Sequence, residues 1–369
     1  MYWSKRLVIN LKNLVKNYEA LCSFLPEGVK VLPVIKNDAY GHGLVEVAEC
    51  LSKRGVWGWG LSEPYEAEVL RKKGFKERIL LLSGFEKDWL EEFPRLNITP
   101  VIASVEEAKW CAEFFKKKGL KVSVHLKVDT GMHRFGIDEK RISQVVSVLK
   151  NSYTKVEGIM THLASSEEPE SELTKSQLEN LKKILKYLKS LGIFPEYVHF
   201  ANTGGIIFLQ EKGNLVRPGI GLFGGYPSKR AKELIKLYPV MTLYSKIIEV
   251  KELKPGERAG YGGAFKAERK TLLGLVPVGY GDGYPRILGG RGFASVRGKR
   301  VKVVGRVSMK ALYVDITDVP GVKKGDEVIL LGGENSEVPA DELAELAQTI
   351  SYELFCNLGR GINREYIKC

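Results

Sequence analysis

The amino-acid sequence predicts an α/β protein with two parts: an N-terminal (β/α)8, TIM-like barrel over residues 1–237 and a C-terminal mainly-β domain over residues 238–369. Three observations lead to this fold class. The chain has 369 residues, which is long for one hydrophobic core. Eight β-rich runs alternate with amphipathic stretches over roughly 235 residues, close to the length of a typical barrel. Beyond them, short strands follow one another between glycine-rich or charged turns.

The eight predicted barrel strands are short runs of β-favouring residues closed by turn formers. They begin at Val31, Trp57, Arg78, Ile98, Lys121, Val156, Tyr197 and Leu215. Helical patterns lie between most of them, and the clearest covers residues 176–191, where a leucine-rich face lies opposite lysines. Several helices are expected to end at a glycine before a new strand: Gly55, Gly74, Gly119 and Gly192.

A doubly wound sheet is the competing architecture. It would usually have about five or six strands and a G-x-G-x-x-G phosphate fingerprint after the first of them. Here the first strand leads into KNDAYGHG, whereas the G-x-G-x-x-G at residues 219–224 follows the eighth strand and has no acidic residue about 20 positions downstream. The barrel is therefore favoured.

The C-terminal part predicts strands within residues 241–253, 271–280, 294–309, 311–317 and 326–333, and one helix near residues 340–351. The short spacing of these runs and the turn residues between them are typical of an all-β domain. The division at residue 238 leaves open whether a strand from the N-terminus joins this domain.

Bulk composition argues against several classes of function. No apolar run approaches the ~18 residues of a membrane span, and the N-terminus lacks the apolar segment of a secretion signal, so we expect a cytoplasmic protein without a membrane partner. The net charge of +13 comes from basic residues mixed with glutamates on helix faces, which disfavours a nucleic-acid site. Five widely spaced cysteines without C-x-x-C indicate reduced thiols rather than a disulfide framework or a zinc site.

Residues that carry chemistry cluster at the predicted C-terminal ends of the strands, where barrel enzymes place their active sites. Lys36 closes the first strand, where partial burial favours the neutral, nucleophilic amine. At the other strand ends stand Asp129, Thr130, His133, Arg134, His162, Asn202, Thr203, Arg217 and Gly219. Because the remaining histidines are scattered and H-E-x-x-H is absent, we predict no catalytic metal.

Two glycine-containing segments, residues 203–205 and 219–221, follow the seventh and eighth predicted strands, where barrels bind phosphate. Bare backbone N–H groups and the Thr203 hydroxyl suit an oxyanion there. A lysine that can form a Schiff base, a phosphate cradle and an arginine on one rim indicate pyridoxal 5'-phosphate. An aldolase that forms a Schiff base with a sugar phosphate would use similar parts and remains the rival.

The motifs together resemble the alanine racemase family, and they run in the family's order from about residue 5 to residue 366: VIKNDAYGHG, KVDTGMHRFG, MTHLASS, ANTGG, VRPGIGLFGGYP, AGYGGAF, VGYGDGYPR, GRVSM and SYELFC. The resemblance implies a pyridoxal-phosphate-dependent isomerase that interconverts L-alanine and D-alanine by a two-base mechanism. It also implies the supply of D-alanine for the peptidoglycan of the cell wall.

The resemblance assigns roles to individual positions. It implies that Lys36 binds the cofactor and serves as one catalytic base, and that Tyr261 from the partner subunit of a homodimer serves as the other. The further cofactor-binding residues would be Tyr40, His162, Thr203, Arg217, Gly219, Ile220 and Tyr352, and the substrate-binding residues Arg134 and the partner-contributed Met309. Lys127 matches a position that is carbamylated in some relatives.

These residue types suit racemisation, which removes a Cα proton from one face and returns a proton to the other. Two bases on opposite faces do this directly, and each contributes about 10²–10⁴-fold. A phenol has an ordinary pKa of about 10 and is a poor base near neutrality, so Arg217 and His162 are expected to supply positive charge that favours the phenolate. Because Arg217 can only donate, it would leave the pyridine nitrogen unprotonated and disfavour transamination.

Three features depart from the family's pattern. Lys310 stands where the family commonly has an acid, and residues 361–364 are GINR where Arg-Val-Pro-Arg is usual. The aspartate at the family's active-site entrance corresponds to Glu167 or Glu168. Two further functions stay open: a broad-specificity amino-acid racemase on the same scaffold, and a non-racemising pyridoxal-phosphate binder or decarboxylase, against which Tyr261 and Arg134 argue.

Overall fold

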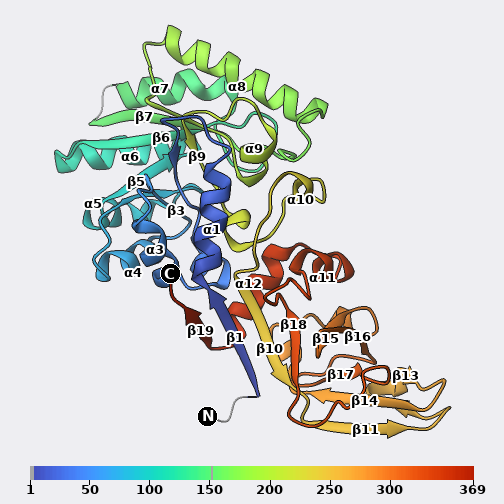
Figure 1. Cartoon of the computed structure of the whole chain (residues 1–369). Coiled ribbons are helices and arrows are strands. Elements are labelled where there is room, and N and C mark those ends of the chain that lie inside the picture. The colour runs from blue at the N-terminus through green and yellow to red at the C-terminus, as the bar shows by residue number, and fades with distance from the viewer. Residues whose placement is uncertain (1–3, 151–152) are drawn as a thin grey trace.

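The computed structural model describes residues 4–150 and 153–369, and it contains a barrel and a separate, mostly antiparallel β domain (Figure 1). Each strand of the barrel overlaps one of the eight runs predicted from the sequence. Their bounds are β2 Lys30–Val31, β3 Gly58–Leu61, β4 Arg78–Leu81, β5 Ile98–Ile102, β6 Val122–Lys127, β7 Thr154–Met160, β8 Tyr197–His199 and β9 Leu215–Val216.

Hydrogen bonds link the eight strands into a ring. Strands β3 to β8 form one parallel sheet in chain order, and β2 pairs in parallel with β9. A parallel bridge between Val34 and Gly60 joins the β2 segment to β3. On the other side, the backbone N–H of Arg217 donates to the carbonyl oxygen of Ala201 (2.9 Å), which joins the β9 segment to β8. The predicted barrel fold is confirmed.

Helices surround the barrel on its outside (Figure 1). Ser104 and Glu107 form a capping box at the start of α6, and Gly119 ends that helix with a φ of 67°. The predicted leucine-rich helix is α8, which buries Leu181, Ile184 and Leu188. The bounds are α1 Leu11–Cys22, α3 Leu44–Ser52, α4 Pro64–Lys72, α5 Glu92–Leu96, α6 Val105–Lys118, α7 Ile142–Lys150, α8 Glu172–Ser190, α9 Thr203–Phe208 and α10 Ala231–Leu234.

The β domain is built on one sheet in the order β11-β14-β17-β16-β15-β18-β10-β1-β19, beside the small pair β12-β13. The helix predicted near residue 340 is α11, Ala340–Leu346. The strands that follow the barrel in sequence are β10 Met241–Lys246, β11 Glu249–Leu253, β12 Arg258–Ala259, β13 Phe265–Lys266, β14 Thr271–Val276, β15 Phe293–Val296, β16 Lys299–Val304, β17 Leu312–Asp315 and β18 Glu327–Leu331.

Both ends of the described chain contribute strands to this sheet. Strand β1 (Lys5–Asn10) pairs antiparallel with β10 and parallel with β19 (Arg364–Ile367). The following helix α1 packs against the barrel side, so β1 and α1 cross from one part of the molecule to the other (Figure 1). The two parts therefore share a continuous backbone connection at the start of the chain as well as near residue 238.

The segment after β2 forms a left-handed turn, where the sequence predicted the end of a strand. Residues Asn37 to Tyr40 of α2 (Lys36–Gly41) all have φ between 53° and 55°. Non-glycine residues pay about 1–2 kcal/mol each for this conformation, so it needs support from outside the turn. The expectation that Lys36 ends the first strand is thus wrong, and Lys36 instead begins the left-handed turn.

Helix α12 (Ser351–Gly361) and the strand after it hold this turn in place. Asn37 donates to Cys356 Sγ (2.9 Å) and accepts from Arg360 (2.8 Å), and Asp38 forms an ion pair with Arg364. Gly41 lies so close to the helix that a Cβ atom there would be 2.4 Å from the carbonyl oxygen of Phe355. The C-terminal segment of the chain and Glu66 of α4, which accepts a hydrogen bond from the Asn37 N–H, therefore together set the position of Lys36.

One expectation about the cysteines is wrong: Cys50 and Cys369 form a disulfide, so two of the five thiols are paired. Cys50 lies on the barrel helix α3 and Cys369 just beyond β19, so the bond ties together segments that are 319 positions apart. Cys22, Cys111 and Cys356 are free. Within residues 4–150 and 153–369, no helix is long and apolar enough to cross a membrane.

Candidate active site

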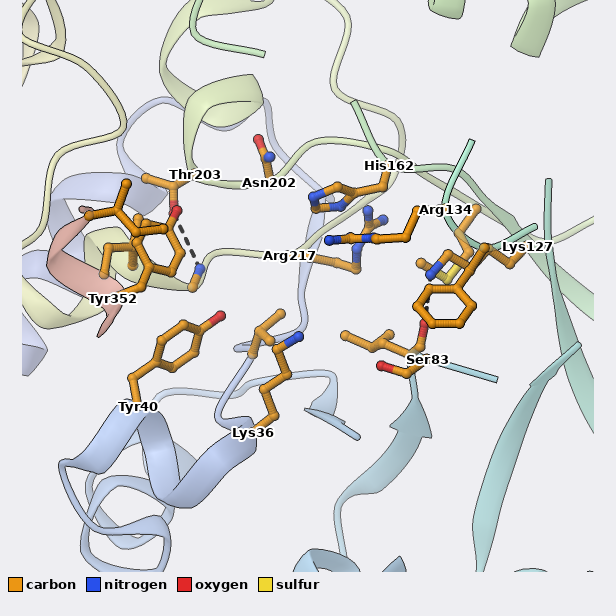
Figure 2. Close-up of a pocket in the computed structure, with 17 residues that line it drawn as sticks. Lys36, Tyr40, Ser83, Lys127, Arg134, His162, Asn202, Thr203, Arg217 and Tyr352 are labelled. Carbon is orange, nitrogen blue, oxygen red and sulfur yellow. Dashed lines mark hydrogen bonds between the residues drawn. The ribbon is translucent and has the colours of Figure 1, made fainter. Parts of the chain in front are cut away.

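A cavity of about 380 Å³ opens at the C-terminal ends of the barrel strands (Figure 2). It collects predicted residues from five strand ends and from α12: Lys36, Tyr40, Arg134, His162, Thr203, Arg217, Gly219, Ile220 and Tyr352. Nine of the eleven residues predicted for the site therefore share one cavity, although they are spread over more than 300 positions of sequence.

The charged side chains that line this cavity are all positive. Four cationic side chains, those of Lys36, Lys127, Arg134 and Arg217, contribute to its lining, which includes no aspartate or glutamate. Burial, and then the charge of Arg134, lower the pKa of Lys36. Within the described chain, Lys36 Nζ has no hydrogen-bond partner and points into the cavity (Figure 2). The site therefore suits an anionic ligand that meets a reactive amine.

Arg217 is buried at the back of the cavity and is held by the protein at its terminal nitrogens. One of them, Nη1, donates to His199 Nδ1 (3.0 Å) and to the His199 carbonyl oxygen (2.6 Å). The other, Nη2, donates to the Thr161 carbonyl oxygen (2.7 Å) and lies 3.5 Å from that of Phe200. Of the five N–H groups of a guanidinium, only that on Nε has no acceptor among the described residues and is left for a ligand. Burial lowers the pKa of Arg217 to about 10, so the group stays charged near neutrality.

His162 lies beside Arg217 on the cavity wall (Figure 2). Burial and the neighbouring cations, Arg217 first among them, lower the pKa of His162 to about 3. The imidazole is therefore neutral near neutrality. The expectation that His162 supplies positive charge is wrong, because desolvation and four nearby cations disfavour a further one.

The opposite end of the cavity has the shape of an oxyanion cradle. Thr203 Oγ1 accepts hydrogen bonds from the backbone N–H groups of Gly219 (3.2 Å) and Gly221 (3.3 Å). A Cβ atom at position 219 would lie 2.8 Å from Tyr40 Oη, so only glycine leaves the hydroxyl its place. Tyr40 and Tyr352 pack with ring centroids 5.8 Å apart. Hydroxyls and backbone donors thus converge where the sequence predicted a phosphate site.

Lys127, at the end of β6, points toward the same cavity from the opposite side. Its Nζ donates to the Leu82 carbonyl oxygen (2.9 Å) and lies 5.2 Å from the ring centroid of Phe135. Burial, followed by the charges of Arg217 and Arg134, lowers the pKa of Lys127 to about 8. A substantial fraction of this amine is therefore neutral at mildly alkaline pH.

Tyr261 and Met309 lie in the β domain, outside the residues that line the cavity. Tyr261 begins the short 3₁₀ helix η4 (Tyr261–Gly263) and is 69% exposed, and Met309 is 58% exposed. Within one chain, therefore, the structure does not bring these two predicted residues to Lys36.

Two of the three departures from the family's pattern, Lys310 and the segment that begins at Gly361, meet at Asp282. Lys310 Nζ lies 2.6 Å from Asp282 Oδ1, and Lys5 Nζ lies 2.8 Å from the same oxygen. A Cβ atom at Gly361 would be 2.6 Å from the Asp282 carbonyl oxygen, so a larger residue there needs the backbone to shift.

The third departure concerns the two candidate acids, Glu167 and Glu168. Burial, and then the charge of Glu167, raise the pKa of Tyr352 to about 12, so Glu167 lies close to this cavity residue.

Several lining residues were missed in the sequence: Ser83, Phe135, Met160 and Ile350. Ser83 follows β4, and its position after a predicted strand was a usable signal. Ile350 directly precedes α12 and carries no such signal. It reaches the cavity because α12 packs against the barrel, a contact between distant parts of the sequence.

Comparisons with known proteins agree with this geometry. Residues 9–227 match the family described as "Alanine racemase, N-terminal domain", and residues 240–366 match "Alanine racemase, C-terminal domain". A curated alanine racemase of Syntrophobacter fumaroxidans is 38% identical over 355 residues, which are 95% of this chain and 94% of the relative.

Solved structures give the same result. That of an alanine racemase from Clostridium difficile 630 has a TM-score of 0.91 and 35% identity, over 100% of this chain and 97% of its own. An alanine racemase from Bartonella henselae, described with covalently bound pyridoxal phosphate, has a TM-score of 0.90 and 28% identity, over 99% of this chain and 100% of its own. The chain belongs to the alanine racemase family.

Proposed function

We propose that this protein is an alanine racemase that interconverts L-alanine and D-alanine with pyridoxal 5'-phosphate as cofactor. The observation that carries the proposal is the content of the barrel cavity: within the described residues, it holds a Lys36 amine with a lowered pKa and no hydrogen-bond partner, an Arg217 with one free N–H, and no carboxylate in the lining. Family membership supports it independently. A sugar-phosphate aldolase would share the lysine and the cradle, but the family matches point away from it.

The residues of the cavity fit this cofactor. Thr203, Tyr40 and the backbone of Gly219 and Ile220 would hold its phosphate, with Tyr352 packed against Tyr40. The Nε–H of Arg217 would meet the ring nitrogen, and His162 would lie beside the ring. When bound, pyridoxal phosphate stabilises negative charge at the Cα atom of an amino acid.

The chain's own residues would then move the proton. Lys36 Nζ would remove it from Cα on one face, because a lowered pKa makes the amine a better base near neutrality. Arg134 would bind the substrate carboxylate. Alanine suits this site better than lysine or arginine. The cationic side chain of a basic substrate would be a fifth positive charge in a cavity that already holds four.

The second base is proposed to come from a partner subunit. Tyr261 and Met309 are exposed on the β domain together with Tyr280 and Ile287, which are 44% and 40% exposed. In a two-fold symmetric dimer this face would meet the barrel mouth of the other subunit, so that each active site receives Tyr261 and Met309 from its partner. The division at residue 238 would then separate a cofactor-binding barrel from a domain that completes the neighbouring site.

The proposal predicts racemisation with exchange at Cα. In ²H₂O, L-alanine should yield D-alanine deuterated at Cα without release of CO₂, and borohydride reduction followed by peptide mapping should label Lys36. Release of CO₂, or a label on another lysine, would contradict the proposal.

Assays with serine, lysine and arginine beside alanine test the range of substrates, and a comparable rate on a basic amino acid would contradict the narrow substrate assignment. Such an enzyme is expected to act in the cytoplasm, where it would supply D-alanine for the synthesis of peptidoglycan.

A further inference from the structure

Behind Arg217, on the side away from the cavity, polar side chains form a row through the barrel. His199 of β8 accepts from Arg217 at Nδ1, and its Nε2 lies 2.8 Å from Nδ1 of His125 on β6. His125 Nε2 faces Glu157 of β7, 3.6 Å from Oε2, and Glu157 pairs with Arg78 at 3.0 Å. Both imidazoles are fully buried, whereas the Arg78 side chain is 47% exposed. The row thus runs from the active site to the protein surface.

The direction of donation along this row follows from one fact, which is that a guanidinium donates and never accepts. His199 Nδ1 must be the acceptor, so the proton of neutral His199 is on Nε2. That N–H donates to His125 Nδ1, which places the proton of neutral His125 on Nε2, toward Glu157. At 3.6 Å the carboxylate attracts this N–H without a full hydrogen bond.

The charges agree with this assignment. Burial and the charge of Arg217 lower the pKa of His199, while burial lowers that of His125 against the opposing pull of Glu157. His125 and Arg78 hold the pKa of Glu157 at about 2. Near neutrality the row therefore contains two neutral imidazoles between a cation at the active site and an ionised carboxylate.

The surroundings of His125 are shaped for this arrangement. A Cβ atom at Gly158, next to Glu157 on β7, would lie 2.3 Å from His125 Nδ1, so the ring occupies space that only glycine leaves. The rings of Trp57 and Tyr197 lie against His125, with centroids 5.9 Å and 6.1 Å away. The imidazole therefore has little freedom to turn.

We propose that His199, His125 and Glu157 are positioning residues that fix the orientation of Arg217, so that only its Nε–H faces the cavity. If His199 carried its proton on Nδ1, two N–H groups would face each other and the guanidinium would have to turn. This inference rests on the proposed function, in which Arg217 meets the ring nitrogen of the cofactor. Glu157 would thus influence the active site through two imidazoles without touching cofactor or substrate.

Nitrogen NMR of the holoenzyme with ¹⁵N-labelled histidine tests the row without any turnover. The chain has five histidines, so His125→Gln and His199→Gln spectra assign the two signals. We expect both rings to be neutral with the proton on Nε2 from pH 6 to pH 9. A proton on Nδ1 of either ring, or titration within that range, would overturn the proposal. Because no activity is needed, this result is independent of whether the chain racemises alanine.

Three variants test the effect on Arg217. Glu157→Leu removes the carboxylate, and Glu157→Gln keeps an oxygen acceptor. Arg78→Gln breaks the outer ion pair and removes the guanidinium that lies 4.9 Å from the Trp57 ring centroid, but leaves Glu157 in place. For Glu157→Leu we expect kcat to fall roughly tenfold, the size seen for outer hydrogen-bond partners at metal sites, with a KM for alanine within about twofold, a shifted cofactor absorption band and more transamination per turnover.

Glu157→Gln should recover most of the wild-type values, and Arg78→Gln should match wild type. A folded Glu157→Leu protein with wild-type kcat and absorption would overturn the positioning role. So would equal losses in Glu157→Leu and Arg78→Gln, since these would reflect the ion pair alone. If Glu157→Leu fails to fold, the NMR measurement on the wild-type holoenzyme still decides the proposal. A wild-type protein that does not racemise alanine would instead contradict the proposed function.

Discussion

The guanidinium of Arg217 has three short hydrogen bonds to protein acceptors at its terminal nitrogens, with a fourth acceptor at 3.5 Å. Because arginine cannot give up its charge near neutrality, a ring nitrogen at its Nε–H would stay unprotonated. If the proposed cofactor is bound there, this side chain would favour rapid return of a proton to Cα over side reactions. In the proposed function, the choice between racemisation and transamination would therefore depend on this one residue.

Replacement of Arg217 tests that choice. Arg217→Glu puts an acceptor where the donor was, so we expect kcat for racemisation to fall by about 10²-fold or more, the cost of losing one preorganised donor. Pyruvate formed per racemisation event should rise, as measured by a coupled assay on L-alanine. Arg217→Lys, which keeps a positive donor, should show a smaller rise. A Glu variant that racemises slowly without extra pyruvate would contradict this account.

Lys127 adds a prediction with a defined pH dependence. CO₂ reacts with the neutral amine to form a carbamate and release a proton. With a pKa of about 8, about one tenth of Lys127 is neutral at pH 7, compared with under one thousandth of an ordinary lysine. The carbamate would place a negative charge among Arg134, Arg217 and Lys36, so we expect it to form, and to form more fully as the pH rises from 6 to 8.

Carbon NMR of the protein in ¹³C-bicarbonate measures this modification. The wild-type carbamate signal should be absent from Lys127→Met and present in Lys155→Met, a control in which Lys127 is retained. A signal that persists in Lys127→Met would assign the carbamate to another amine. Its absence from the wild type at pH 8 would contradict the prediction.

At the scale of elements, the left-handed turn of α2 links the C-terminal segment to Lys36, the proposed catalytic amine. Asp38 both accepts from the Leu44 N–H at the start of α3 (2.7 Å) and pairs with Arg364. The hydrogen bond to the Leu44 N–H should contribute more to the stability of the turn than the ion pair with Arg364. The Asp38 side chain is half exposed, and exposed ion pairs stabilise little. The turn, rather than a strand, therefore positions Lys36.

Asp38→Ala should lower the free energy of unfolding by about 1–2 kcal/mol, through loss of the hydrogen bond to the start of α3. It should also weaken retention of the cofactor, because Lys36 loses its fixed place. Asp38→Asn keeps the acceptor and tolerates the left-handed backbone, so it should stay within about 0.5 kcal/mol of wild type. Urea titration and dialysis against free cofactor measure the two effects. An equal loss of unfolding free energy in both variants would show that the ion pair, and not the hydrogen bond, is the main stabilising interaction of Asp38.

The sequence predicted the barrel elements well and this turn not at all, for a physical reason. Strands β2 to β9 are local apolar runs closed by turn residues, and each is readable from its own neighbours. The turn is held by Glu66 on another helix and by Cys356, Arg360 and Arg364, which contact residues more than 300 positions earlier. Similarly, the pKa of His162 depends on cations from other strands, so its neutral state could not be read from its own motif.

At the scale of the whole molecule, the two ends of the described chain meet in one sheet, where Leu7 pairs with Arg364. No local pattern reports such a pairing, and the same is true of the Cys50–Cys369 disulfide. The arrangement places the exposed Tyr261 and Met309 on the β domain and Lys36 in the barrel. One chain alone thus presents half of each proposed active site.

Mixed dimers test whether active sites are shared. Lys36→Ala and Tyr261→Phe homodimers should each be nearly inactive, because every site lacks one base. After subunit exchange in a 1:1 mixture, about half of the dimers are mixed, and each mixed dimer has one intact site and one site that lacks both bases. Activity should therefore recover to about one quarter of wild type if the two-fold dimer shares its sites. A mixture that exchanges subunits, shown by native mass spectrometry, yet stays inactive would mean that Lys36 and Tyr261 act from the same chain.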